Sequence, residues 1–239
     1  MNDLTPAAGG ALALPGRGFE GLKADRADLI IPRCKLLQAL SPEVVESKFE
    51  WAKAGLLINS LTLDVLPSRV VPIFTWKSYC RFNPRNRSEE GFDATYEPGA
   101  MIWRSIDPDD VRVIEETKFG PNGEKPLAMT CLNFFSLFPG VPMPNVCSFT
   151  KTSYKTGRQL LSLARFCGGD MWSRAYQLTS AVQTRPEGTY YVQQIAALGA
   201  SFGEEQQIAE SWWRQFSDRA AELKVHEEEK PEDGETAPF

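Results

Sequence analysis

The stretch RVVPIFTWKSYCRF, residues 69–82, is the segment of the chain that decides the fold. It is rich in β-branched and aromatic residues, which favour strands. Pro72 has no backbone N–H to donate to a neighbouring strand, so we expect this part of the strand to be a sheet edge or a bulge. The preceding stretch LLINSLTLDVL, residues 56–66, has the same character. The two stretches are therefore predicted to be successive strands.

Further strands are expected on both sides of a long polar loop at residues 83–100. Loops of this length inside compact domains are usually functional or mobile. The same β-branched and aromatic enrichment predicts strands at 101–105, 111–116, 127–138, 145–150, 171–184 and 188–199. The last two of these are predicted to form a hairpin around a turn at 186–188.

Three segments carry helix signals. Residues 41–49 begin with a Ser-Pro pair, which suits the N-cap and the first helical position. Residues 153–166 (SYKTGRQLLSLARF) can turn Leu160, Leu161 and Ala164 towards a sheet. In the last helix, Ser201 and Glu204 are expected to form a capping box. Its apolar positions recur at helical spacing: Ile208, Trp212, Phe216, Ala220 and Leu223.

This order of elements predicts a mainly β protein with helices, in the α+β class. It fits an antiparallel barrel with a helix inserted between its third and fourth strands, which is the OB-fold arrangement, here enlarged and followed by a C-terminal helix. An α+β sheet domain of another topology fits almost as well. Composition divides the chain into a flexible leader (1–20), one OB-like nucleic-acid-binding domain (21–224) and a disordered acidic tail (225–239).

Charge is distributed unevenly along the chain. Residues 227–239 hold six acids and one lysine, so the whole net charge of −5 lies there and the rest is neutral. Within the neutral part, residues 68–87 contain five bases and no acid, and residues 149–166 contain four bases and no acid. Both segments are interleaved with aromatic residues. Because bases neutralise phosphates and rings stack on unpaired nucleobases, the two segments predict a surface for single-stranded nucleic acid.

The candidate DNA-binding residues are the basic and aromatic side chains of these segments and of the short strand at 101–105. They are Trp76, Lys77, Tyr79, Arg81, Phe82, Arg85, Arg87, Trp103, Arg104, Lys151, Tyr154, Lys155 and Arg158. Strand alternation puts Trp76 and Phe82 on one face, and Lys77, Tyr79 and Arg81 on the other. They cannot all line one groove unless a bulge rotates the strand, so Tyr79 is favoured for stacking and Trp76 for the core.

Several kinds of chemistry lack support in the sequence. The chain has one histidine, His226, which leaves little basis for a histidine-assisted nucleophile or a histidine-bearing zinc site. The five cysteines are dispersed without metal-ligand spacing, and there is neither a P-loop nor a GxGxxG motif. We therefore expect no metal, no cofactor and no enzymatic activity.

One alternative is a magnesium-dependent nuclease. Pro108-Asp109 followed by Glu116 and Lys118 is similar to the Pro-Asp…Glu-x-Lys signature of a large nuclease superfamily, in which the two acids hold Mg²⁺ and the lysine supports the attacking water. The spacing between the two acids is shorter than that family normally needs to bring two strands together. An exposed acidic turn is the simpler interpretation.

The C-terminus carries a resemblance to a known family. An acidic segment ending in Pro238-Phe239 resembles the tails of single-stranded DNA-binding proteins from bacteria and their phages. Residues 28–44 and 153–165 also look like stretches of phage proteins assigned to DNA replication and recombination. The resemblance implies an OB-fold that coats single strands, with a tail that recruits partner proteins. The partner-binding residues would be Asp233, Glu235, Pro238 and Phe239. The bacterial form has a long Gly- and Gln-rich linker that this chain lacks, so the phage form fits better.

The expected partners are single-stranded DNA and replication or recombination proteins, with a possible homodimer. Dispersed cysteines suggest reduced thiols, and no apolar stretch is long enough to span a membrane, so the expected location is the cytoplasm, that of the host cell if a phage encodes the chain. An RNA-binding protein, and a phage protein that blocks a host enzyme by mimicking DNA, stay open as alternatives.

Overall fold

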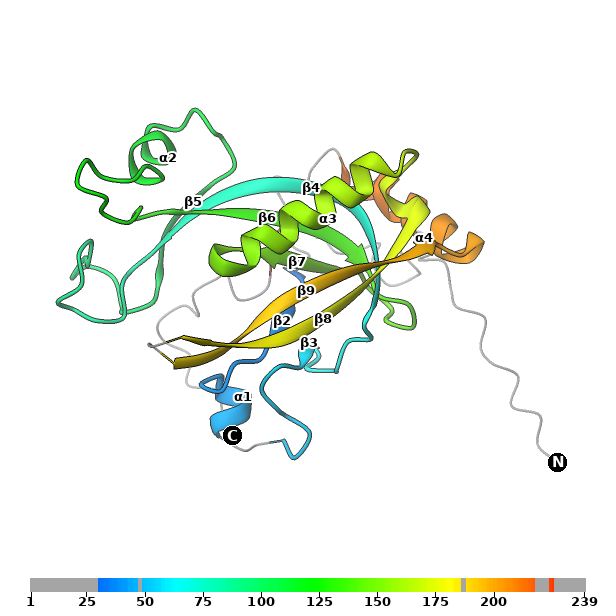
Figure 1. Ribbon diagram of the computed structural model, residues 1–239, viewed down its shortest axis with the longest axis horizontal. Helices are drawn as coiled ribbons and strands as arrows, with labels where there is room; N and C mark the ends of the chain where they lie inside the picture. The colour runs from blue at the N-terminus through cyan, green and yellow to red at the C-terminus, as the bar shows by residue number, and fades with distance from the viewer. Residues whose placement is uncertain (1–29, 47–48, 186–187, 218–223, 226–239) are drawn as a thin grey trace, which may run out of the picture.

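The structure is a computed structural model that describes residues 30–46, 49–185, 188–217 and 224–225. Its largest sheet has six strands (Figure 1), in the order β7-β6-β4-β8-β9, with β5 paired to one end of β4. These strands are β4 (Arg69–Phe82), β5 (Met101–Ser105), β6 (Met129–Leu137), β7 (Asn145–Phe149), β8 (Arg174–Arg185) and β9 (Gly188–Ala200).

Two small strand pairs and four α-helices complete the fold. β1 (Ile30–Ile31) pairs with β10 (Lys224–Val225), and β2 (Cys34–Leu36) pairs with β3 (Leu57–Asn59). The helices are α1 (Pro42–Val45), α2 (Val111–Glu116), α3 (Tyr154–Phe166) and α4 (Gly203–Phe216), with 3₁₀ turns η2 (Lys151–Ser153) and η3 (Met171–Ser173). The prediction of a mainly β, α+β protein is confirmed. The expected closed barrel is wrong: the large sheet is open, because β7 and β9, its two edge strands, do not pair in the described part of the chain.

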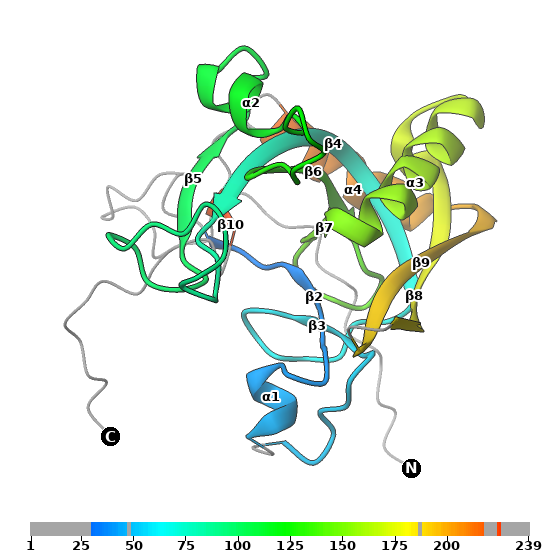
Figure 2. The ribbon, with the colours of Figure 1, turned by 60° about the vertical axis from the view of Figure 1, so that its left-hand side comes forward.

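Strand β4 is the centre of the sheet. It pairs with β6 over residues 71–80, with β8 at Arg69 and Val70, and with β5 from Tyr79 onward. Its register against β6 shifts between Pro72 and Phe74, where the bulge was expected. The strand curves strongly around this irregularity (Figure 2), so one strand serves both halves of the sheet.

The two faces of the sheet bury separate apolar cores. Phe134 and Phe135 are neighbours on β6 and therefore point to opposite faces. Phe134 lies in a core with Phe149, Tyr176 and Leu160 of α3, among others. Phe135 lies in the other core with Trp212 of α4, which it meets edge-on at 6.1 Å between ring centroids. Helices α3 and α4 thus cover opposite faces of the sheet.

The N-terminal segment and helix α3 bridge the gap between β7 and β9. On one side, Val146 of β7 donates its backbone N–H to Pro32, just before β2. Further along this segment, the Gln38 side chain both donates to the carbonyl of Tyr191 on β9 and accepts from its N–H, at 2.9 and 2.8 Å. In addition, Thr156 of α3 donates to the Gln193 carbonyl at 2.9 Å. These contacts form a seam in place of a β7–β9 ladder.

Three sequence predictions need correction. Residues 111–116 form helix α2 and not a strand, because the Asp110 carboxylate caps the helix by accepting the Arg112 N–H at 2.9 Å. The strand expected at 56–66 ends at Asn59, whose side chain accepts the Leu61 and Thr62 N–H groups and turns the chain.

The third correction concerns helix α4, which starts one residue later than expected. Phe202 is its N-cap, and Glu205, not Glu204, accepts the Phe202 N–H at 2.7 Å. The Ser201 hydroxyl instead donates to the carbonyl of Trp172. The buried stripe of α4 contains Ala209, Trp212 and Phe216, while the predicted positions 220 and 223 lie outside the described residues.

Candidate nucleic-acid interface

Helix α3 is held against the sheet by its glycine and its apolar stripe. Gly157 lies so close to β7 that an added Cβ would be 2.6 Å from the Phe149 Cβ. Leu160 and Ala164 continue this buried face. The opposite face is therefore turned to solvent, and it carries Lys155 and Arg158, both exposed.

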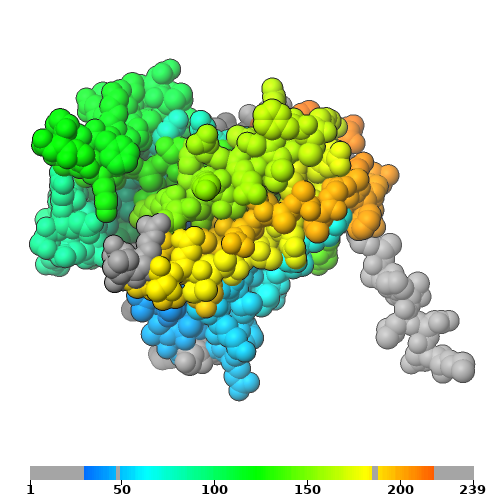
Figure 3. Space-filling model, viewed as in Figure 1, coloured from blue at the N-terminus to red at the C-terminus, as the bar shows by residue number. Residues whose placement is uncertain are grey.

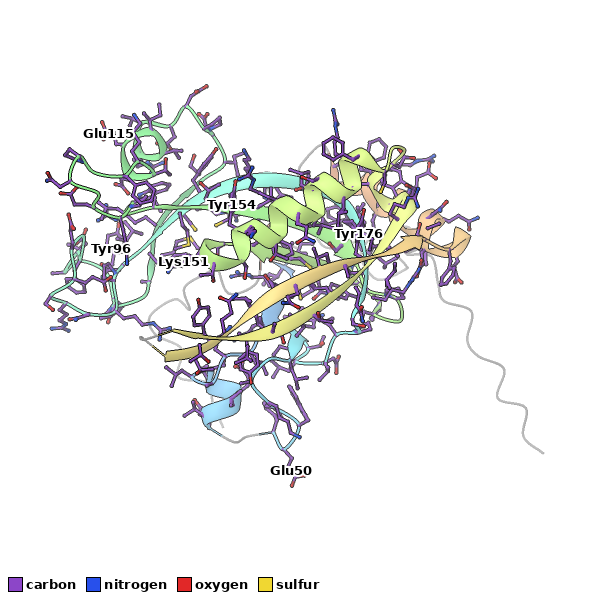
Figure 4. All side chains as sticks on the ribbon, viewed as in Figure 1. Glu50, Tyr96, Glu115, Lys151, Tyr154 and Tyr176 are labelled. Carbon is purple, nitrogen blue, oxygen red and sulfur yellow. The ribbon has the colours of Figure 1, made fainter. Side chains whose placement is uncertain are left out.

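The N-terminal end of α3 points towards the part of the chain at 83–128, which we call the lobe. Lys151, in the 3₁₀ turn before α3, is exposed and has a φ of 45°, an unusual backbone conformation for a lysine. Tyr154 packs against the core of this face and stays half-buried. Figure 4 shows Lys151 and Tyr154 at this end of α3, with Tyr96 across from them in the lobe.

Lys77 of β4 belongs to the same face of the sheet as α3. It lies opposite Leu132 of β6, which in turn lies opposite Phe149 of β7, the residue that Gly157 contacts. Two strand spacings separate Lys77 from Phe149, about 10 Å. Lys77 is exposed, and Tyr79, two residues on, is half-buried. The structure therefore brings Lys77 of segment 68–87 to the face that carries segment 149–166.

Trp76 does not share that face. Trp76 packs against the α4 core beside Phe74, with ring centroids 5.7 Å apart, and its buried Nε1 has no hydrogen-bond partner among the described residues. Phe82 follows a second register shift of β4 and is 36% exposed. The alternation argument that favoured Tyr79 over Trp76 agrees with this arrangement.

Arg81 and Trp103 are built into the lobe. The Glu116 carboxylate accepts from Arg81 Nη1 on one oxygen and from Trp103 Nε1 on the other, both at 2.9 Å. Trp103 is 8% exposed and lies in a small core with Val113 and Ala128. Its expected role as an exposed stacking platform is therefore wrong, because burial leaves no free ring face.

The same contacts bear on the nuclease alternative. Both oxygens of Glu116 are already occupied, and the segment that holds it is a helix where the signature needs a strand. Asp109 and Lys118 are exposed on either side of α2. Within the described ranges, no group of three or more His, Cys, Asp or Glu could hold a metal ion.

The remaining basic candidates differ in their exposure to solvent. Arg104 is half-buried, whereas Arg85 and Arg87 are exposed in the polar loop. The sequence interpretation left out Arg165, which is exposed on α3 one heptad after Arg158, and that spacing was the available signal. Seven exposed cations make no ion pair with any described residue: Lys77, Arg85, Arg87, Lys151, Lys155, Arg158 and Arg165.

Other predictions fall outside what the structure describes. The proposed tail contacts Asp233, Glu235, Pro238 and Phe239 and the leader at 1–20 lie outside the described residues. Of the helices in the described part, none is both long and apolar enough to cross a membrane.

The fold and this surface define an α+β protein with an open sheet, one face of which presents a half-buried tyrosine and exposed cations that have no ion-pair partner in the described part of the chain. Comparison with protein families identifies the family: the model of the Pam3 phage gp34-like proteins matches residues 2–222. The chain belongs to this phage protein family. No curated protein and no solved structure matches it.

Proposed function

We propose that the protein binds single-stranded DNA without sequence preference and acts in phage DNA replication or recombination. The observation that carries the proposal is a set of exposed cations on the α3 face that make no ion pair within the described residues, among them Lys77, Lys151, Lys155 and Arg158, with Tyr154 beside them. Cations without a protein counter-ion are available to phosphates, and a half-exposed ring offers one face to a base.

The strand order gives independent support. In an OB-fold the first strand pairs with both the second and the fourth, and a helix joins the third strand to the fourth. Here β4 pairs with β6 and with β8, and α3 joins β7 to β8. The order therefore corresponds to an OB-fold whose final pairing, between the third and fifth strands, is replaced by the seam.

Membership in a phage protein family agrees with the acidic, phenylalanine-ended tail. In this proposal the protein works in the host cytoplasm, without a cofactor and without enzymatic activity. The tail, with a net charge of −5, competes with DNA for the α3 face and docks on a replication or recombination protein through Pro238 and Phe239.

Fluorescence anisotropy with labelled oligo-dT, oligo-rU and duplex of equal length tests the proposal, with and without Mg²⁺. We expect the tightest binding to oligo-dT and an affinity that falls as salt rises. The double variant Lys155→Glu/Arg158→Glu should weaken binding and flatten the slope of log K against log salt by about 0.7 for each phosphate that the variant no longer neutralises. Lys53→Glu, at an exposed position before β3, is the matched control and should bind as the wild type does.

Three results would count against single-stranded DNA binding. An affinity that does not depend on salt would contradict phosphate contacts. Tighter binding to oligo-rU would favour an RNA-binding protein. Magnesium-dependent cleavage of the probe would favour the nuclease alternative, with Asp109 as the first residue to test, because Glu116 already accepts hydrogen bonds from Arg81 and Trp103.

The tail is tested by two further variants. Deletion of residues 227–239 should tighten DNA binding at low salt, because a tethered competitor is removed. Phe239→Ala keeps all six carboxylates, so it should change DNA binding little while losing the partner protein. If the wild type and Phe239→Ala retain the same partners in pull-downs from infected cells, the terminal ring has no docking role.

A further inference from the structure

The lobe has a small apolar core and several large apolar side chains exposed around it. Its buried residues are Trp103, Val113 and Ala128. Around them, five large apolar side chains of residues 106–127 are exposed to between 39% and 72%: Ile106, Val111, Ile114, Phe119 and Leu127. Clustered exposed apolar residues on one projection mark a contact surface more often than scattered ones do.

The lobe is also acidic. Residues 83–128 contain ten acids and six bases, a net charge of −4. One of these bases, Arg112, is held by Asp110, to which it donates at 2.7 Å, and this contact lowers the pKa of Asp110 to about 2. Six exposed acids of the lobe make no ion pair with any described residue: Glu89, Glu90, Glu97, Asp107, Asp109 and Glu115.

These charges indicate which surface could dock on the lobe. Two lobes facing each other would bring −4 against −4, which disfavours a lobe-to-lobe dimer. Residues 149–166, on α3, carry four bases and no acid, a net charge of +4. They also expose Phe166 to 88%, an apolar side chain that could meet those of the lobe. The α3 face of a second copy therefore complements the lobe in both charge and apolar contact.

The lobe cannot dock in this way on the α3 face of its own molecule, because that movement would break the pairing of β5 with β4. β5 fixes the lobe to β4 through paired residues from Tyr79 to Phe82. The space-filling view shows the lobe as a projection beside α3 (Figure 3), and Glu115 lies on its outer side (Figure 4). A contact made by this outer side must come from another molecule.

We propose that the protein self-associates head to tail, the acidic apolar lobe of one copy docking on the basic α3 face of the next. Such a contact is heterologous, so it leaves a free lobe at one end and a free α3 face at the other and can extend into a chain. The proposal rests on the proposed function in one respect: it covers the same α3 face that DNA would use, so DNA and self-association compete.

Sedimentation velocity of the full chain without DNA tests the contact directly. We expect the wild type to associate as its concentration rises and to dissociate at high salt, because screening weakens contacts between exposed charges. The lobe variant Ile114→Ser/Phe119→Ser and the α3 variant Lys155→Glu/Arg158→Glu should each remain monomeric. Val182→Ser, which removes an exposed apolar side chain from β8, should associate as the wild type does.

Mixing the two monomeric variants gives the sharpest result. The lobe variant keeps an intact α3 face and the α3 variant keeps an intact lobe, so an equimolar mixture should form a one-to-one dimer that grows no further. A wild type that stays monomeric at every concentration, a lobe variant that still associates, or a mixture that stays monomeric would each overturn the proposal. Added oligo-dT should dissociate the wild-type assembly. Association that DNA does not reverse would refute the competition, whereas a failure of the proposed function would appear as an absence of DNA binding by anisotropy.

Discussion

Replacing Gly157 with alanine tests how closely α3 lies on the sheet. In a helix interior, alanine is favoured over glycine by about 1 kcal/mol, so helix propensity alone predicts stabilisation. At this position the added Cβ would lie 2.6 Å from the Cβ and 2.9 Å from the Cγ of Phe149. These atoms are the root of a fully buried side chain and cannot swing away as the end of a flexible chain could.

The overpacking cost should exceed the gain in propensity. Adding a methyl group to a well-packed core costs about 1–3 kcal/mol. Subtracting the gain of about 1 kcal/mol leaves a net loss of about 1 kcal/mol in the free energy of unfolding. For a chain of this size that loss lowers Tm by about 2–4 °C.

Differential scanning calorimetry of Gly157→Ala beside Gly203→Ala measures the difference. Gly203 is the first residue of α4, and a Cβ there would meet nothing within 4 Å. Its replacement should leave Tm unchanged or raise it slightly. If Gly157→Ala melts at or above the wild-type temperature, α3 does not lie this close to β7, and the placement of the basic face beside Lys77 loses its basis.

Three further predictions concern the packing of the rest of the domain. The hydrogen bond from Arg69 holds the pKa of Glu205 below its ordinary value of 4.5, so Glu205→Gln should cost about 1.5 kcal/mol at neutral pH. Because the pKa is lowered on folding, this difference from the wild type should be full above pH 4.5 and should vanish as pH falls through the folded-state pKa, which urea titrations at several pH values would follow. Trp212→Ala should cost about 3–5 kcal/mol by chemical denaturation, whereas Trp213→Ala, 40% exposed, should cost much less. Gln38→Ala removes both side-chain hydrogen bonds to β9, about 1 kcal/mol each, so hydrogen exchange at that edge of β9 should speed up while exchange in β6 stays the same.

Much of the fold followed from local sequence signals. The strand at 69–82 and its bulge near Pro72 could be predicted because proline withholds a backbone donor whatever the tertiary context. Helix α3 and the β8–β9 hairpin also follow from patterns within their own residues. The error at 111–116 has a local cause as well: Val-Arg-Val alternates as a strand does, and the competing signal was the capping carboxylate of Asp110.

The candidate site was harder to predict, because residues distant in the sequence determine whether a basic side chain is exposed or held in an ion pair. Arg81 and Lys77 both project from β4 among aromatic residues, and nothing in their own segment distinguishes them. Glu116, 35 residues after Arg81, binds Arg81 and Trp103 together and removes both from the surface. The open edge between β7 and β9 likewise could not be predicted from the strands, because the contacts that cross it come from Gln38, far earlier in the chain, and from Thr156 of α3.

The seam also sets an order for folding during synthesis. Gln38 and Tyr191 are 153 residues apart, so at about 5–20 residues per second the ribosome makes the glutamine roughly 8–30 s before its partner. β7 is made before β9, so the N-terminal segment can bind β7 first and β9 last. The hairpin β8–β9, whose contacts are local, can form as soon as it emerges. Although β2 can pair with β3 as soon as both are made, the first described segment to be synthesised completes its contacts only after β9, near the end of synthesis.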